Sequence, residues 1–169
     1  AYEIYMGDWS SDVCSSDLVV ELVERDDDAA ATSFRWDILV QGREGFACPD
    51  NFGFDPAGRL WIVTDNDDRS APNNGCFVCD TAGAERGQPR QMLSGPNGCE
   101  IAGCEFNPDG TTLFLSIQHP GEGGSLDEPS SHWPDGGDLP PRSTLIAVRR
   151  EDGDPDRKST RLNSSHPYR

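Results

Sequence analysis

The chain has 169 residues, of which 34% are hydrophobic, 18 are Gly and 13 are Pro. It carries 30 acidic against 14 basic residues, and this formal net charge of −16 argues against nucleic acid and anionic membranes as partners. No apolar run reaches the roughly 18 residues that a transmembrane helix needs.

The two ends of the chain have related coding sequences. Gly7–Leu18 (GDWSSDVCSSDL) and Asp156–Pro167 (DRKSTRLNSSHP) can be encoded by opposite strands of one short DNA, which resembles a common sequencing-adapter end. We therefore interpret residues 1–18 and 156–169 as non-native, adapter-derived tails and leave them out of fold reasoning. Natural Ser-rich termini are the alternative. Residues 19–155 are then the gene-derived part, one small domain or part of a larger one.

Short strands joined by Gly- and Pro-rich turns are the expected structure of this middle part, because apolar and β-branched residues occur in short runs. In chain order, the sequence predicts strands at 19–23, 34–41, 51–54, 60–64, 76–79, 91–93, 100–106, 113–117 and 144–149. The segment 119–142 is too polar for a core and reads as a long inserted loop.

A strand–turn–strand unit occurs twice. FGFDPAGRLWIVTD, ending at Asp65, has a weaker copy in CEFNPDGTTLFLSIQ, ending at Gln118. The copies match Phe54 with Phe106, Pro56 with Pro108 and Gly58 with Gly110, each pair 52 residues apart. A repeat of about this length is typical of β-propeller blades. We therefore predict an all-β fold, one to three antiparallel blades from the C-terminal part of a larger β-propeller.

Polar residues lie where the predicted strands begin or end, which is where propellers collect ligands. They form four groups: Asp50 with Asn51, Asp65 with the three polar residues after it, Glu100, and Gln118–Glu122 with His119. Carboxylate and amide oxygens suit Ca²⁺, and a carboxylate set joined by Cys or His suits iron. The structural alternatives are Asx-turn capping by Asp50 and Asn51, a solvated loop at Asp65, and a packed His119. Glu100 stands among small and apolar residues, which favours a ligand role.

The cysteines allow several interpretations. Cys76 and Cys79 have the spacing of half a zinc site, but a strand points them to opposite faces. Buried free thiols are the default expectation for the cysteines outside the tails. A disulfide between Cys99 and Cys104 is the alternative in an exported protein.

Five motifs in order resemble one family. They are AATSFRWDILVQG (Ala30–Gly42), FACPDNFGFDPAGRLWIVTD (Phe46–Asp65), GCEIAGCEFNPDGTTLFLSIQHPGE (Gly98–Glu122), SHWPDGG (Ser131–Gly137) and PRSTLIAVRREDG (Pro141–Gly153). Together they resemble the C-terminal part of the PhoX family of bacterial alkaline phosphatases. The resemblance implies an exported propeller that uses the twin-arginine route and is periplasmic or secreted, a metal centre of iron (Fe³⁺) and Ca²⁺, and hydrolysis of small phosphomonoesters by a monomeric protein.

From position and chemistry we assign Asp50, Asn51, Asp65 and Glu100 to this metal centre or its surroundings. The possible pocket residues around it are His119, Glu122 and His132. The family's N-terminal ligands are missing, so we expect this segment alone to be inactive. The alternatives are a calcium-dependent, lactonase-like propeller and a non-catalytic, calcium-binding propeller, and an iron requirement would distinguish the phosphatase from both.

Overall fold

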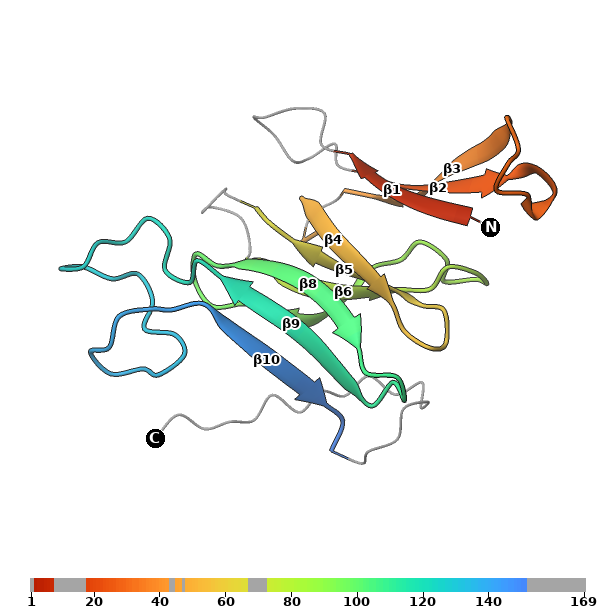
Figure 1. Ribbon diagram of the computed structural model, residues 1–169. Coiled ribbons are helices and arrows are strands. Elements are labelled where there is room, and N and C mark those ends of the chain that lie inside the picture. Colours follow the sequence, from red (N-terminus) through yellow and green to blue (C-terminus); the bar gives the residue numbers. More distant parts are fainter. Residues whose placement is uncertain (1, 8–17, 43–44, 47, 67–72, 152–169) are drawn as a thin grey trace.

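The computed structural model describes residues 2–7, 18–42, 45–46, 48–66 and 73–151. Within these ranges the chain forms ten strands and one short 3₁₀ turn at Arg25–Asp27, with no α-helix. The strands are β1 (Tyr2–Gly7), β2 (Leu18–Glu24), β3 (Phe34–Gln41), β4 (Pro49–Phe54), β5 (Leu60–Thr64), β6 (Gly75–Cys79), β7 (Arg90–Ser94), β8 (Glu100–Phe106), β9 (Thr112–Gln118) and β10 (Thr144–Arg149) (Figure 1). No described residue belongs to a helix long and apolar enough to cross a membrane.

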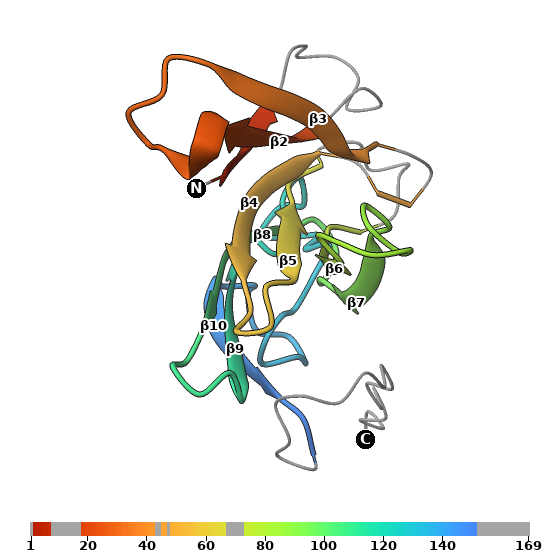
Figure 2. The same cartoon turned by 90° about the vertical axis from the view of Figure 1, so that its right-hand side faces the viewer.

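The strands form three antiparallel sheets. Their strand orders are β1-β2-β3, β4-β5-β6-β7 and β10-β9-β8, and Figure 2 shows the sheets following one another through the molecule. The four-stranded sheet is a sequential meander, as in a propeller blade. The predicted fold class, an all-β propeller piece of one to three blades, is confirmed, and each predicted strand is present within two residues of its expected bounds.

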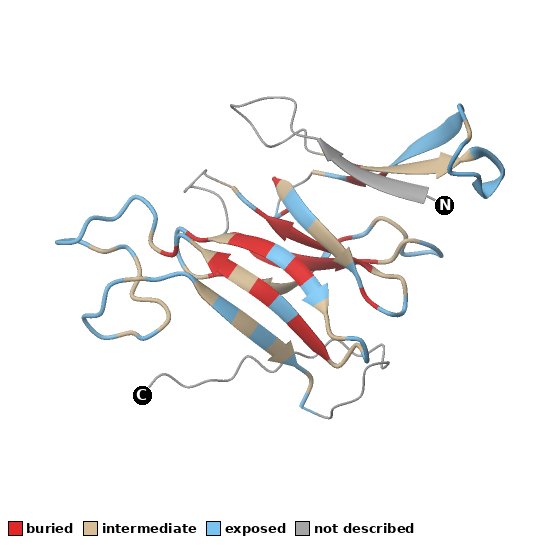
Figure 3. Ribbon diagram, viewed as in Figure 1, coloured by how far each residue is buried: buried red, intermediate tan, exposed pale blue. Residues whose placement is uncertain are grey.

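The middle sheet contributes to two separate cores, because its two central strands, β5 and β6, are buried on both faces. Leu60 and Ile62 of β5 face the core shared with β2 and β3, whereas Trp61 and Val63 face the core shared with β8 and β9. Alternate residues of a strand point to opposite faces, so one pentapeptide serves both cores. By contrast, β3 is largely exposed, with Trp36 65% accessible (Figure 3).

The repeated turns are equivalent in structure, which confirms the repeat. The amide N of Gly58 donates to the Asp55 carbonyl at 2.9 Å, and the amide N of Gly110 donates to the Asn107 carbonyl at 2.9 Å. A Cβ on Gly110 would lie 2.8 Å from Cγ of Pro56, so the two turns also pack against each other.

Asp55 organises the first turn from a buried position, with 6% of its surface exposed. It accepts hydrogen bonds from the backbone amides of Ala57 and Arg59, from Arg59 Nε at 2.6 Å and from Trp61 Nε1 at 3.0 Å. This acid is a structural part of the turn, as its position in an Asp-Pro-x-Gly sequence predicts.

The middle sheet and the β8-β9-β10 sheet approach each other through their first strands. A Cβ on Gly53 of β4 would lie only 2.3 Å from the carbonyl oxygen of Cys104 on β8. Cys104 follows a register shift in β8 at Gly103, whose φ of +62° is in the left-handed region that glycine favours. The glycine in β4 and the irregularity in β8 therefore set how closely these two strands can pack.

The predicted tails lie mostly outside the described residues. Positions 8–17 and 152–169 are not described, while Tyr2–Gly7 pairs with β2 as β1. This pairing does not test whether the tails are adapter-derived, which stays a prediction.

Candidate metal site

The described members of all four predicted groups of polar residues lie at one edge of the sheets, while Asp67 and Asp68 of the second group lie outside the described residues. Asp50 is near the start of β4, and Asp65 directly follows β5. Glu100 begins β8, and Gln118 ends β9. In an antiparallel pair the start of one strand lies beside the end of its partner, so each pair brings its polar residues to one place. β4 and β8 also run side by side, so both places lie at the left-hand ends of these strands in Figure 1. We call this part of the molecule the acidic edge, and it comprises Asp50, Asn51, Asp65, Glu100 and Gln118–Glu122.

A local irregularity presents the first group. Pro49 pairs with Thr64 and Asn51 pairs with Val63, so Asp50 lies at a register shift with no partner of its own in the ladder. Asp50 and Asn51 are both exposed, and Asn51 Nδ2 donates a hydrogen bond to Asp50 Oδ2. Bulges of this kind re-aim side chains next to functional sites.

Glu100 is half-buried at the start of β8. It is the register partner of Gln118 on β9, and Gln118 Nε2 donates to Glu100 Oε1 at 3.2 Å. The second carboxylate oxygen, Oε2, has no hydrogen bond of its own among those of the described residues. The glutamate is therefore held from one side.

The charged residues of the acidic edge change the pKa of Glu100. Burial, the largest cause, raises the pKa of Glu100, and the charges of Asp65, Asp50 and Glu122 raise it further, while His119 lowers it. The predicted ligands and pocket residues on β4, β5, β8 and the loop after β9 are thus close enough to interact electrostatically. A cation among them would relieve both the repulsion and the desolvation of Glu100.

Two loops are joined at this edge. The amide N of Gly121 donates to the Asn97 carbonyl at 2.8 Å, and the amide N of Glu122 donates to the Gly98 carbonyl at 3.0 Å. A Cβ on Gly98 would lie 2.9 Å from Glu122 backbone atoms, so the contact requires glycine. His119 has a φ of +47°, in the left-handed region. The loop that carries His119 and Glu122 is therefore attached to the segment leading into Glu100.

His132 is placed differently. It lies in the long loop between β9 and β10, where its ring Nδ1 is 2.9 Å from the Leu139 carbonyl oxygen. The charges of Asp50, Asp65, His119 and Glu122 thus act on Glu100, whereas His132 stays a prediction as a pocket residue.

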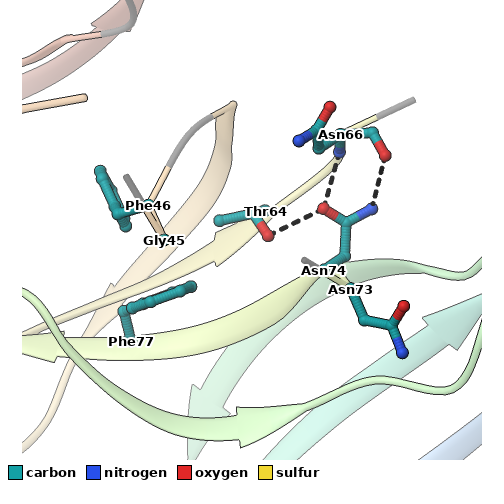
Figure 4. A pocket seen from close by; sticks show the side chains of 7 residues that line it. All are labelled: Gly45, Phe46, Thr64, Asn66, Asn73, Asn74 and Phe77. Atoms are coloured by element: carbon teal, nitrogen blue, oxygen red, sulfur yellow. Dashed lines mark hydrogen bonds between the residues drawn. The ribbon is translucent and has the colours of Figure 1, made fainter. Parts of the chain in front are cut away.

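Asn74, which lies just before β6, is a residue that the sequence did not single out. Its buried amide hydrogen-bonds to residues on both sides of the acidic edge, and it lines a small pocket with Thr64, Asn66, Asn73, Gly45, Phe46 and Phe77 (Figure 4). The sequence signal was only a polar pair, Asn73-Asn74, before a strand.

The donor chemistry of the acidic edge fits a hard cation, since carboxylate and amide oxygens are the ligands that Ca²⁺ takes. Among the described residues, however, no three His, Cys, Asp or Glu side chains form a group that could hold a metal ion by itself. The assignment of these residues to a metal centre therefore stays a prediction.

The described cysteines form neither the half zinc site nor the disulfide that the sequence left open. Cys76 and Cys79 lie in different cores on opposite faces of β6, as the strand interpretation predicts, so they cannot form half of a zinc site together. Cys99 and Cys104 are free, buried thiols and do not form the alternative disulfide. Burial raises the pKa of Cys99 to about 11. Cys48 differs from the expectation of a free thiol, because it is disulfide-bonded.

Comparison with known proteins decides the family. The model of the alkaline phosphatase PhoX family matches residues 15–121, well over half of the chain. The chain belongs to the PhoX alkaline phosphatase family. A solved structure of Pseudomonas fluorescens PhoX in complex with vanadate, a transition-state analogue, is 36% identical to it, with a TM-score of 0.70. That match covers 82% of this chain and 27% of the Pseudomonas chain, so the sequence spans about a quarter of its solved PhoX relative. The search of curated proteins gave no match.

The PhoX assignment confirms the resemblance that the motifs indicated. The matched range ends at Gly121 and therefore contains every residue of the acidic edge except Glu122. The family is one of metal-dependent phosphatases, which agrees with the chemistry of the edge. Membership of this family does not support the alternative of a calcium-dependent, lactonase-like propeller.

Proposed function

We propose that this chain supplies one side of the metal centre of a phosphatase that hydrolyses small phosphomonoesters. One observation carries the proposal: in a PhoX family chain, the charges of acids from two strand ends and one loop act on Glu100, which begins a third strand. The vanadate complex of the Pseudomonas relative supports a phosphoryl substrate.

In this proposal Asp50, Asp65 and Glu100 contribute carboxylate oxygens, and Asn51 contributes its amide oxygen. The ions are Ca²⁺ and Fe³⁺, with Ca²⁺ the better match to an all-oxygen set. When bound, such ions polarise the phosphoryl oxygens and provide an activated oxygen nucleophile. The chain's own contribution is to place the oxygens before the ion arrives, because Asp50 sits on a register shift and Glu100 is held by Gln118.

His119 and Glu122 would border the substrate, because their loop is joined to the segment before Glu100. His132 would lie farther out in the same loop. An imidazole beside the acids can balance negative charge where a phosphate group approaches. We further propose a periplasmic or secreted monomer, in keeping with the family resemblance, which cell fractionation and size-exclusion chromatography would test.

The experiment compares Glu100→Gln with Glu105→Gln in the protein produced from its intact gene. Both residues lie on β8, but Glu105 is exposed near the opposite end of the strand. We expect Glu100→Gln to reduce p-nitrophenyl phosphate hydrolysis at least about 100-fold and to weaken Ca²⁺ binding, since it removes a proposed ligand. Glu105→Gln should behave as the unmodified protein. Unchanged metal content and activity in Glu100→Gln would refute the assignment.

A further inference from the structure

Asn74 is buried, with 6% of the residue exposed, and every donor and acceptor site of its side-chain amide takes part in a hydrogen bond. Its Oδ1 accepts from Thr64 Oγ1 at 2.9 Å and from the amide N of Asn66 at 2.7 Å. Its Nδ2 donates to the Asn66 carbonyl at 3.2 Å and to the Cys99 carbonyl at 2.8 Å. Figure 4 shows the amide directed at both backbone groups of Asn66. Two acceptor sites and two donors are the capacity of an asparagine amide.

The partners of this amide are the immediate neighbours of two proposed ligands. Asn66 follows Asp65, and Cys99 precedes Glu100. Asp65 follows a strand of the middle sheet, whereas Glu100 begins a strand of the next sheet. Among the described strands, no backbone ladder joins these two sheets, so a side chain that bonds to both can fix one acid relative to the other.

The backbone around Asn74 strengthens this link. The Asn74 carbonyl accepts from the amide N of Gly95 at 2.7 Å, which ties it to the loop before Glu100. Thr64 Oγ1 also accepts from the amide N of Gly75 at 3.0 Å, so the hydroxyl that orients the amide is itself held. The arrangement is a continuous hydrogen-bonded bridge from the end of β5 to the start of β8.

Such a bridge matters because Asp65 and Glu100 carry like charges that repel each other. Ligand carboxylates must be held close together before the ion binds, and surrounding hydrogen bonds do this in metal sites. An aspartate at position 74 has the same shape but cannot donate to the Asn66 and Cys99 carbonyls. Only the amide satisfies all four partners.

We propose that Asn74 is a positioning residue that sets the spacing between Asp65 and Glu100 across the two sheets, and thereby the metal affinity of the acidic edge. This inference rests on the proposed function, because it concerns the same metal centre. Asn74 itself need not touch the metal or the substrate.

The test uses Asn74→Asp in the protein produced from its intact gene, with Asn107→Asp as the matched control. Asn107 also has a side chain bonded to the backbone, accepting from the amide N of Thr112 at 2.9 Å, but it lies in the turn at the opposite edge of its sheet. The first readout is luminescence titration with Tb³⁺, an oxygen-binding substitute for Ca²⁺. We expect Asn74→Asp to weaken Tb³⁺ binding about 10- to 100-fold, and Asn107→Asp to leave it unchanged.

The second readout needs no metal. Amide hydrogen exchange of the metal-free protein should accelerate at Asn66 and around Glu100 in Asn74→Asp, and should not do so there in Asn107→Asp. If the unmodified protein binds no Tb³⁺ but this exchange pattern appears, the proposed function fails while the positioning role stands. If the variant folds and neither Tb³⁺ affinity nor exchange changes, the positioning role is refuted.

A second variant covers the case in which Asn74→Asp does not fold. Thr64→Val removes the hydroxyl that donates to Asn74 Oδ1 and keeps a similar shape. We expect a smaller loss of Tb³⁺ affinity in the same direction, with faster exchange at Asn66. A folded Thr64→Val protein with unchanged affinity and exchange would overturn the proposal.

Discussion

Gly53→Ala probes the spacing of the acidic edge without touching any proposed ligand. The new Cβ would lie 2.3 Å from the Cys104 carbonyl oxygen, whereas real Cβ contacts are essentially never shorter than 3.0 Å. The oxygen belongs to the backbone and cannot swing aside, so β4 and β8 must separate by about 0.7 Å. Overpacking of this kind costs about 1–3 kcal/mol in the free energy of unfolding.

The separation also moves Asp50 away from Glu100, because these acids lie at the starts of the two strands. Displacements of about 1 Å in a preorganised site cost up to about 100-fold, so we expect Ca²⁺ affinity to fall about 10-fold or more. Urea unfolding would measure the stability, and calorimetric titration of the folded variant with Ca²⁺ would measure the affinity.

Gly83→Ala is the control for stability loss alone. Gly83 has a φ of +85°, and a Cβ added there would meet nothing within 4 Å, so alanine costs only backbone strain, about 1–2 kcal/mol. We expect Gly83→Ala to lower stability and keep Ca²⁺ affinity. Equal Ca²⁺ affinities for the two variants would refute the reasoning that strand spacing sets the site.

Three further predictions concern other parts of the chain. Asp55→Ala should lower the free energy of unfolding by about 3–5 kcal/mol in urea titrations, because it leaves Trp61 Nε1 and the Arg59 guanidinium without their shared acceptor; a loss below about 1 kcal/mol would contradict this. Asp109→Asn should destabilise the protein at neutral pH but not in acid, since hydrogen bonds from Thr111 lower the pKa of Asp109. The stabilisation by the ionised Asp109 carboxylate is present above the unfolded-state pKa and is lost as pH falls through the lower folded-state pKa. Equal differences in melting temperature between variant and unmodified protein at both pH values would disprove this prediction. The Cys76 thiol should resist iodoacetamide at pH 8 until the protein unfolds, because a hydrogen bond with the Cys104 thiol and burial raise its pKa; mass spectrometry that finds rapid native-state alkylation would argue against this.

The strands could be predicted because local chemistry determines them. The run Leu60–Thr64 is apolar and β-branched almost throughout, and the Asp-Pro-x-Gly turn before it forms as its residues require. The opposite orientations of Cys76 and Cys79 also follow from strand alternation alone.

The candidate site could be predicted only in outline. Strand ends indicated Asp65 and Glu100, since the repeat places them at equivalent edges of consecutive sheets. Asn74 could not be found in this way, because its importance comes from carbonyls on two sheets that meet only in three dimensions. The register shift at Asp50 likewise depends on pairing that no local pattern reveals.

The central claim is that the acidic edge belongs to the metal centre of a phosphomonoesterase. The most direct measurement is p-nitrophenyl phosphate hydrolysis by the protein produced from its intact gene, with and without Ca²⁺, together with its iron content by elemental analysis. The account predicts Ca²⁺-dependent turnover and bound iron, both diminished in Glu100→Gln. A pure, folded protein with neither turnover nor iron would contradict it and leave Glu100 with a structural role.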